Sequence, residues 1–231
     1  MLDINKHRTI LLQILKDIYT DISLGPILGF KGGTAAYLFY ELSRFSVDLD
    51  FDLLDENKED LVFEKVEKIL EEYGEIKEKD NKKRFTLFYV LSYEKETHKV
   101  KVEINIKKFG SKYELKNYLG IPMLVMVKED MVAHKLVALT DRKKPANRDI
   151  FDIWFFLKNN FDINEEIIKK RAECSLKEYF KQCINHIEKV NERQILNGMG
   201  ELLDEKTKIW AKKNLKKDVM FLMKARMEAT G

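Results

Sequence analysis

One stretch in the first quarter of the chain constrains the fold more than any other. It reads FKGGTAAYLFYELSRFSVDLDFDLL and runs from Phe30 to Leu54. Two adjacent glycines separate a short apolar run from a run of helical character. The segment SVDLDFDLL then alternates polar and hydrophobic residues, as a half-buried β-strand does. A strand, a glycine turn, a helix and a second strand in close succession indicate an α+β protein.

The second strand carries three aspartates on one face. Asp48, Asp50 and Asp52 alternate with apolar residues, so their carboxylates point the same way and repel one another. One explanation is an ordinary solvated strand face. The other is a bound cation such as Mg²⁺, which prefers carboxylate oxygens and removes the repulsion. The strand pattern alone leaves both explanations open.

The glycine pair bears on that choice. Gly32 and Gly33 lie where a strand meets a helix, and Thr34 is a suitable N-cap for that helix. The free amide groups and the dipole at a helix N-terminus favour an anion such as phosphate. Glycine is also the usual residue of a simple turn, because its backbone is unrestricted. The pair therefore indicates either a turn or a phosphate site beside a metal site.

The rest of the chain changes character after its first half. Helical spacing predicts an N-terminal helix around residues 10–18 and a polar helix over residues 57–73, and GPILGF reads as a short buried strand. The runs RFTLFYVLSY and HKVKVEINIKKF predict a β-hairpin. Past Pro122, amphipathic helical segments follow one another, the first being MLVMVKEDMVAHKLVAL. We expect an α+β domain over residues 1–120 and a helical domain over residues 121–231.

Composition excludes some classes of protein. The chain has 42 Lys or Arg against 39 Asp or Glu, so its net charge by itself identifies no partner. No apolar run approaches the roughly 20 residues of a membrane helix. The N-terminal segment alternates polar and apolar residues, unlike a signal peptide. We expect a cytoplasmic protein with no membrane contact.

The C-terminal end is locally basic. From Lys206 to Gly231 there are eight Lys or Arg against two Asp or Glu. This surplus suits an RNA backbone, with Trp210 and Phe221 stacking on bases. The alternative, which we favour, is a solvated helix whose apolar stripe packs on the core. That stripe comprises Ile209, Trp210, Leu215, Val219 and Leu222.

The order of a hydrophobic residue, Gly-Gly, a helix and a hydrophobic-Asp-hydrophobic-Asp strand resembles the signature of the polymerase beta-like nucleotidyltransferase superfamily. KGGTAAYLFYELSRFSVDLDFDL is similar in particular to the AbiEii family of toxin-type nucleotidyltransferases, which includes the MenT toxins. The resemblance implies a mixed sheet flanked by helices, followed by a helical domain that contributes to the site. It also implies that Asp48 and Asp50 are metal ligands. The nucleotide-binding residues it implies in this stretch are Lys31, Gly32, Gly33, Thr34 and Ser46.

A third acidic residue on a neighbouring strand belongs to the same resemblance. Glu103 in VKVEINI fits this position, between Val102 and Ile104. By itself, Glu103 also suits the polar face of an ordinary strand. In the family context it would complete the metal cluster and help to take the proton of the attacking hydroxyl.

A later segment, HKLVALTDRKKPANRDIFDIWF, fits the family order of a lysine, Ala-Leu, an arginine, and an Arg-Asp pair followed by another aspartate. The matching residues are Lys135, Ala138, Leu139, Arg142, Arg148, Asp149 and Asp152. The resemblance implies catalytic roles for Lys135, Asp149 and Asp152, and nucleotide binding by Lys135, Arg142 and Arg148. From the residues alone, Lys135 and Arg142 also suit a solvated basic edge. Asp149 equally suits a helix cap, and Asp152 an ion pair with Arg148.

The resemblance implies metal-dependent transfer of a nucleoside monophosphate from a nucleoside triphosphate to an acceptor hydroxyl, with Mg²⁺ or Mn²⁺ at the site. It implies an RNA acceptor such as the 3′ end of tRNA. It also implies the role of the toxin in a toxin–antitoxin or abortive-infection system, with an antitoxin encoded nearby. Two alternatives stay open: a protein or small-molecule acceptor, and a nucleotide-binding (GTP-binding) or RNA-binding protein without turnover.

Overall fold

The computed structural model describes residues 2–83, 85–94, 99–142 and 146–229. Contacts within this part of the chain group it into two compact units, which we call the sheet unit and the helical unit. The sheet unit comprises Met1–Glu41, Phe45–Lys108 and Lys112–Met126, and the helical unit comprises Leu42–Arg44, Phe109–Ser111 and Val127–Gly231. Two short segments between elements of the sheet unit therefore belong to the helical unit.

The sheet unit is built on a mixed sheet. Across the described residues it has seven strands in the order β3-β4-β5-β2-β1-β7-β6. The strands are β1 Leu28–Lys31, β2 Leu49–Leu53, β3 Glu75–Lys83, β4 Thr86–Ser92, β5 Lys99–Asn105, β6 Tyr113–Tyr118 and β7 Ile121–Met126. The pairs β2–β5 and β1–β7 are parallel, and the other neighbours are antiparallel. The central position of β2 places its residues beside both β1 and β5.

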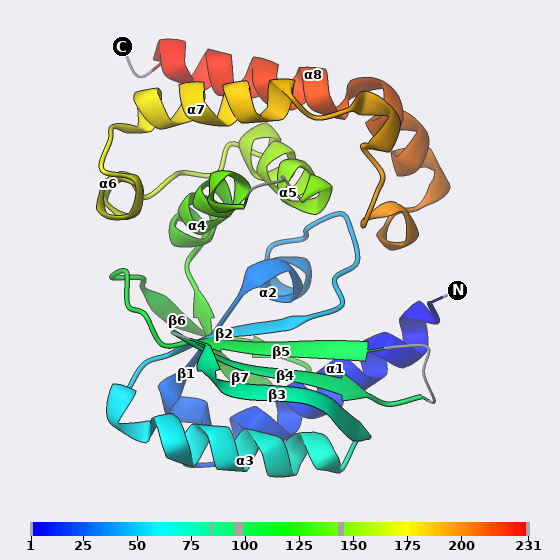
Figure 1. Cartoon of the computed structure of the whole chain (residues 1–231), viewed down its shortest axis with the longest axis vertical. Helices are drawn as coiled ribbons and strands as arrows, with labels where there is room; N and C mark the ends of the chain where they lie inside the picture. Colours follow the sequence, from blue (N-terminus) through cyan, green and yellow to red (C-terminus); the bar gives the residue numbers. More distant parts are fainter. Residues whose placement is uncertain (1, 84, 95–98, 143–145, 230–231) are drawn as a thin grey trace. The chain divides into compact units, whose positions relative to one another are not determined.

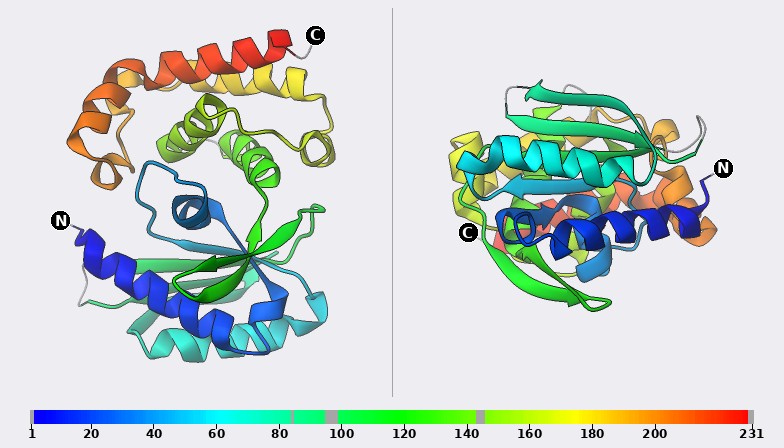
Figure 2. Two further views of the ribbon diagram at one scale, coloured as in Figure 1. Left: turned by 180° about the vertical axis from the view of Figure 1, so that it is seen from behind. Right: turned by 90° about the horizontal axis from the view of Figure 1, so that it is seen from below.

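Helices cover the two faces of this sheet unequally. Helices α1 (Ile4–Thr20) and α3 (Glu59–Glu71) lie side by side on one face (Figures 1 and 2). Apolar residues at helical spacing, such as Ile14 and Val66, are fully buried there. The other face carries the short helix α2 (Gly32–Phe39), which packs on β1 and β2. Since α2 spans only two turns, polar residues of β5 on its face stay partly exposed.

Several predicted elements are confirmed. The N-terminal helix is α1, and the predicted hairpin is the antiparallel pair β4–β5. Strands β3 and β6, whose sequences are strongly polar, were not predicted. The helix predicted directly after Pro122 is wrong for Met123–Met126, which belong to β7. A short apolar run fits a buried strand and a buried helix equally well, and here pairing with β1 and β6 decides for a strand. The sheet thus continues past residue 120.

The helical unit consists mainly of helices. They are α4 Lys128–Asp141, α5 Asn147–Lys158, α6 Glu165–Ala172, α7 Leu176–Glu188 and α8 Glu205–Ala229. Short 3₁₀ turns lie at Gly25–Ile27 and Glu56–Lys58 in the sheet unit, and at Glu192–Gln194 and Gly200–Leu202 in the helical unit. Helices α7 and α8 run side by side (Figure 1). Among the described helices, none is both long and apolar enough to span a bilayer.

The predicted apolar stripe of α8 is only partly correct. Leu215 and Val219 are fully buried, and Trp210 packs on Trp154 with ring centroids 4.1 Å apart. However, Ile209 is 58% exposed, and Leu222 is only half-buried. Phe221, which the sequence suggested for stacking on bases, is 69% exposed. The buried row of the helix has four-residue spacing, Ala211, Leu215, Val219 and Met223. This row, rather than the predicted stripe, anchors α8.

Candidate active site

The turn between β1 and α2 requires glycine. Gly32 has a φ of +79°, a conformation that L-residues rarely adopt. A Cβ atom at this position would lie 2.2 Å from Oδ2 of Asp50, so there is also no space for a side chain. The N-cap of α2, Lys31, provides no side-chain cap for the amide groups of the first turn. The Asp50 carboxylate therefore lies against the N-terminal residue of α2.

Contrary to the prediction, Thr34 is not the N-cap of α2, while its predicted contact with the nucleotide stays a prediction. Helix α2 begins two residues earlier, at Gly32, because the positive φ of this glycine lets the chain turn directly from strand to helix. Thr34 is buried, and its hydroxyl donates a hydrogen bond to the main-chain oxygen of Asp48. This bond holds the segment before β2 against α2. Gly33 is buried in the same turn, and Ser46 is buried in the segment that leads to β2.

Strand register brings two of the predicted carboxylates together. In the parallel pair β2–β5, Asp50 is the Cα partner of Glu103. Their side chains share the sheet face that carries α2, because Leu49 and Phe51 on the other face are fully buried. The Glu103 side chain is 37% exposed and lies 3.1 Å from the ammonium of Lys101. Asp48 lies one residue before β2 and is half-buried.

Asp52, the third alternating aspartate, has a different environment. It is buried, and its Oδ1 lies 2.5 Å from Nζ of Lys31 and accepts a 2.9 Å hydrogen bond from the Asn105 amide. Its Oδ2 accepts a hydrogen bond from the hydroxyl of Tyr113. Burial raises the pKa of Asp52, but the charge of Lys31 and the hydrogen bonds from Lys31, Tyr113 and Asn105 together outweigh burial, so the pKa is lowered. Lys31, predicted to bind nucleotide, thus serves here as the counter-ion of Asp52.

The carboxylates of the sheet unit provide part of the ligand set that a metal ion needs. Within the described residues, no group of three or more His, Cys, Asp or Glu side chains is arranged as a preformed metal site. Magnesium, however, is commonly bound by one or two carboxylates together with substrate phosphates and water. The adjacent carboxylates of Asp50 and Glu103 fit that requirement. The three-residue set of Asp48, Asp50 and Glu103 stays a prediction.

The helical unit gathers three predicted residues of the later motif, Lys135, Asp149 and Asp152, into one buried network. Lys135 on α4 lies 3.0 Å from Oδ1 of Asp149 and 2.9 Å from Oδ2 of Asp152, both on α5. Burial lowers the pKa of Lys135, but the two carboxylates outweigh burial and its pKa is raised. Lys135 therefore acts as a cation and not as a base at neutral pH.

Arg44 is the member of this network that the sequence did not reveal. Its guanidinium forms a bidentate contact with Asp152. Nε donates a hydrogen bond to Oδ1 at 2.5 Å, and Nη2 donates one to Oδ2 at 2.7 Å. Asp152 has no exposed surface, and its pKa is lowered because the charges of Arg44 and Lys135 outweigh burial. The proposed pairing of Asp152 with Arg148 is replaced by these two partners. Nothing in the local pattern around Arg44 indicates a partner 108 residues away.

Asp149 differs from Asp152 in having an under-used oxygen. It lies in the first turn of α5, but the N-cap of that helix is Ala146, so Asp149 is not the cap. Among the described residues, its buried Oδ2 has no hydrogen-bond partner, and Nη1 of Arg142 lies 3.4 Å from it. Lys135 and Arg142 thus contact the same carboxylate from opposite oxygens. Arg148, the second residue of α5, is half-buried.

The structure thus assembles the predicted residues in two sets. Asp50 and Glu103 are neighbours in the sheet unit, and Lys135, Arg142, Asp149 and Asp152 form a network in the helical unit. A glycine turn at a helix N-terminus beside paired strand carboxylates suits the binding of a charged phosphate with a cation.

Solved structures share this fold. A candidate nucleotidyltransferase from H. pylori matches over 100% of this chain and 99% of its own, with a TM-score of 0.63 and 20% identity. JHP933 from Helicobacter pylori matches over 100% of this chain and 97% of its own, with a TM-score of 0.54 and 20% identity. A search of curated proteins finds no match. At this identity, the likeness shows a shared fold.

The family is shown by a sequence model. The model of the nucleotidyl transferase AbiEii toxin of type IV toxin–antitoxin systems matches residues 13–224. This chain belongs to the AbiEii family, so it is a nucleotidyltransferase enzyme of the toxin type. Membership confirms the resemblance found in the Gly-Gly and Asp-Leu-Asp motifs, and it implies a nucleotide substrate and an antitoxin partner.

Proposed function

We propose that this enzyme transfers a nucleoside monophosphate from a nucleoside triphosphate to a hydroxyl of RNA, at the 3′ end of tRNA. The observation that carries this proposal is the pairing of Asp50 with Glu103 on the sheet face beside the N-terminus of α2. An acidic pair next to uncapped helix amides provides for a divalent cation and for an anionic phosphate in adjacent positions.

The roles of the residues follow from their chemistry. The amides of Gly32, Gly33 and Thr34 at the start of α2 hold nucleotide phosphates. Asp50 and Glu103, with Asp48, hold Mg²⁺ or Mn²⁺, which when bound neutralises charge on the attacking and leaving oxygens.

In the transfer step, the acceptor oxygen forms a bond to the α-phosphorus as the bond from that phosphorus to pyrophosphate breaks. Glu103 receives the proton of the acceptor hydroxyl, directly or through water.

The helical unit supplies positive charge for the same reaction. Lys135 stays protonated between Asp149 and Asp152, and Arg142 is 48% exposed, so its guanidinium reaches solvent. We assign Lys135, Arg142 and Arg148 to the phosphates of the nucleotide. Asp149 and Asp152 orient Lys135. A nucleotide added to the 3′ end of tRNA blocks its use in protein synthesis, which accounts for a toxin acting in the cytoplasm.

The test is incubation of the protein with each α-labelled nucleoside triphosphate, Mg²⁺ and total cellular RNA, followed by separation of the products on a gel. We expect label in a tRNA-sized band, lost on chelation with EDTA and restored by Mg²⁺ or Mn²⁺. The Asp48→Ala, Asp50→Ala double variant should give no labelled product. Asp60→Asn is the matched control, because Asp60 is an exposed aspartate in the first turn of α3 on the opposite sheet face.

Each other outcome points to a different function. Transfer retained by a well-folded double variant would exclude the assigned carboxylates. Label in a protein band or a small molecule would replace RNA as the acceptor. Nucleotide binding without any label or pyrophosphate release would favour a binding protein without turnover.

A further inference from the structure

A pocket of about 610 Å³ lies within the helical unit, at the start of α5 and the end of α7. Three cationic side chains line it, those of Arg142, Arg148 and Lys189, together with side-chain amides such as Asn147 and Asn191. Among the described residues that line it, there is no Asp or Glu and no aromatic residue. The lining is therefore positively charged and rich in hydrogen-bonding groups.

Backbone-directed hydrogen bonds hold the walls of this pocket. The Asn147 amide donates to the main-chain oxygens of Gln194 at 2.7 Å and of Asn197 at 3.3 Å, which ties the start of α5 to the opposite wall. Lys216 of α8 donates to the main-chain oxygens of Glu188 and Val190, both at 2.9 Å. These bonds fix the backbone on either side of Lys189 independently of its side chain.

The residues that line the pocket favour a ligand with phosphate and ribose groups. Cations and amides bind phosphate and ribose oxygens, whereas a site for a nucleobase would offer an aromatic surface for stacking. Lys189, Asn191 and Gln194 are exposed, so the pocket is open to solvent and admits part of a longer chain. The uncapped first turn of α5, which begins at Asn147, adds the favourable end of a helix dipole.

We propose that Lys189 and the neighbouring side-chain amides of this pocket bind a backbone phosphate of the acceptor RNA, beside Arg142 and Arg148, which the proposed function assigns to the nucleotide. The inference rests on the proposed function, since it assigns a binding place to the acceptor of that reaction. Arg142 connects the two features, because it lines the pocket and also lies 3.4 Å from Oδ2 of Asp149, a buried oxygen that has no hydrogen-bond partner among the described residues. The backbone of the acceptor RNA would thus lie next to the network of Lys135, Asp149 and Asp152.

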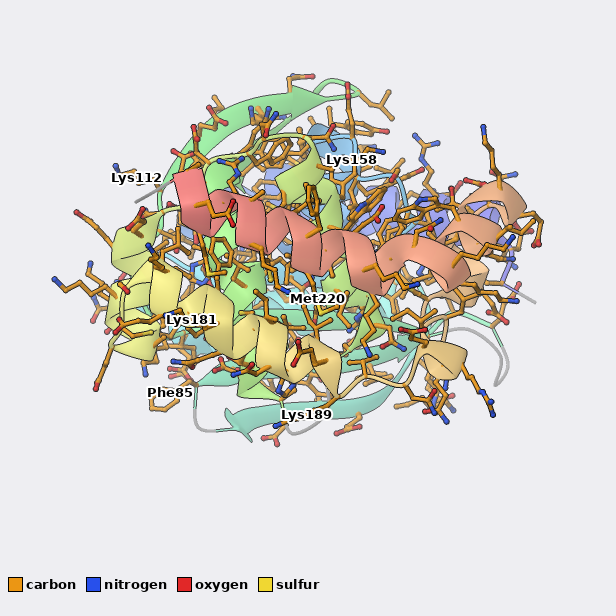
Figure 3. The ribbon with its side chains drawn as sticks, turned by 90° about the horizontal axis from the view of Figure 1, so that it is seen from above. Phe85, Lys112, Lys158, Lys181, Lys189 and Met220 are labelled. Atoms are coloured by element: carbon orange, nitrogen blue, oxygen red, sulfur yellow. The ribbon has the colours of Figure 1, made fainter. Side chains whose placement is uncertain are left out.

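The test measures RNA binding without nucleotide, so it does not depend on turnover. The probe is a fluorescently labelled single-stranded RNA with a free 3′ hydroxyl, titrated with the whole chain at several salt concentrations. Lys189→Gln should weaken binding about fivefold and reduce the slope of log K against log salt by about 0.7, the loss of one phosphate contact. Lys181→Gln is the matched control, because Lys181 is exposed on α7, eight residues before Lys189 at the C-cap of that helix (Figure 3).

A second variant adds a negative charge to the pocket and keeps the hydrogen bond that the replaced side chain makes in the fold. The Asn191 side chain accepts a hydrogen bond from the backbone N–H of Arg193 at 3.0 Å, and aspartate can accept the same bond. Asn191→Asp should therefore fold normally, weaken RNA binding at least as much as Lys189→Gln, and raise the KM for RNA while leaving the KM for the nucleoside triphosphate unchanged.

The outcomes separate this inference from the proposed function. If Lys189→Gln and Lys181→Gln bind RNA equally well, the pocket is not the RNA site. If the variants raise the KM for the nucleotide and leave RNA binding intact, the pocket holds nucleotide phosphates and the inference is overturned. If RNA binding depends on Lys189 but no RNA is ever labelled, the pocket assignment stands and the RNA acceptor of the proposed function fails.

Discussion

The acidic residues of the sheet unit and those of the helical unit differ in burial and in how their charge is balanced. On the sheet face, Asp50 and Glu103 are held side by side by strand register, and the Glu103 side chain is partly exposed beside an equally exposed Lys101. In the helical unit, Asp152 is completely buried and is bound on both oxygens by Arg44 and Lys135. Exposed ion pairs exchange partners at little cost in free energy. Breaking a buried pair leaves a charge without a partner in a medium of low dielectric constant, which is strongly destabilising.

Under the proposed function, this difference separates residues that bind a ligand from residues that maintain the site. We expect Asp50 and Glu103 to accept a cation without unfolding the protein. Asp152 is buried between Arg44 and Lys135, so we expect it to hold Lys135 in place with its charge intact. Asp149 lies between these extremes, since its Oδ1 is bound by Lys135 while its buried Oδ2 accepts no hydrogen bond from the part of the chain that the structure describes.

The largest effect is expected from breaking the buried network. Asp152→Ala leaves Arg44 and Lys135 without their shared carboxylate, and we expect the free energy of unfolding to fall by about 3–5 kcal/mol. Urea denaturation measures it. The matched variant is Lys101→Gln, which removes the exposed partner of Glu103 and should change stability by less than about 1 kcal/mol. Similar losses in the two variants would contradict the distinction drawn between the two regions.

A smaller loss of stability, with a strong loss of activity, is expected at the turn that positions Asp50. Gly32→Ala forces alanine into a positive φ, at about 1–2 kcal/mol, and pushes its Cβ into the Asp50 carboxylate. Displacing a reactive group by about 1 Å can reduce the rate on the order of 100-fold. Steady-state transfer assays together with urea denaturation test this.

Gly120→Ala is the control for that variant. Gly120 has a φ of +83° in the turn between β6 and β7, and a Cβ there would meet no atom within 4 Å. Gly120→Ala should lose only the stability that the positive φ of alanine costs, and it should keep full transfer activity. Equal activity of the two variants would mean that the position of Asp50 does not matter for transfer.

The smallest effect concerns the pH dependence of stability at Asp52. Its pKa is lowered in the folded state, so the stabilisation it provides is fully present above its unfolded pKa of about 4 and disappears as the pH falls through the lower folded value. Asp52→Asn should cost up to about 1 kcal/mol at pH 7. The difference from the unmodified protein should shrink below about pH 4. A difference that is constant down to pH 2 would show that Asp52 is not the charged partner of Lys31.

Local pattern was sufficient for much of the chemistry. The Gly-Gly turn, the helix after it and the alternation of Asp50 with hydrophobic residues depend on neighbours within a few positions, and all are present. The predicted hairpin that carries Glu103 is present for the same reason. Conformational preferences of this kind act over one turn or one strand, and they can be read directly from the order of residues.

The choice of partners required the tertiary structure. Asp50 and Asp52 are indistinguishable in the strand pattern, yet register places one beside Glu103 and the other beside Asn105, with Lys31 and Tyr113 on its oxygens. Arg44 finds Asp152 only because distant segments fold together. The apolar run of β7 became a strand through its neighbours in the sheet. Burial and pairing depend on residues far away in the chain, so no local pattern can specify which carboxylate stays exposed for a ligand and which is neutralised in the core.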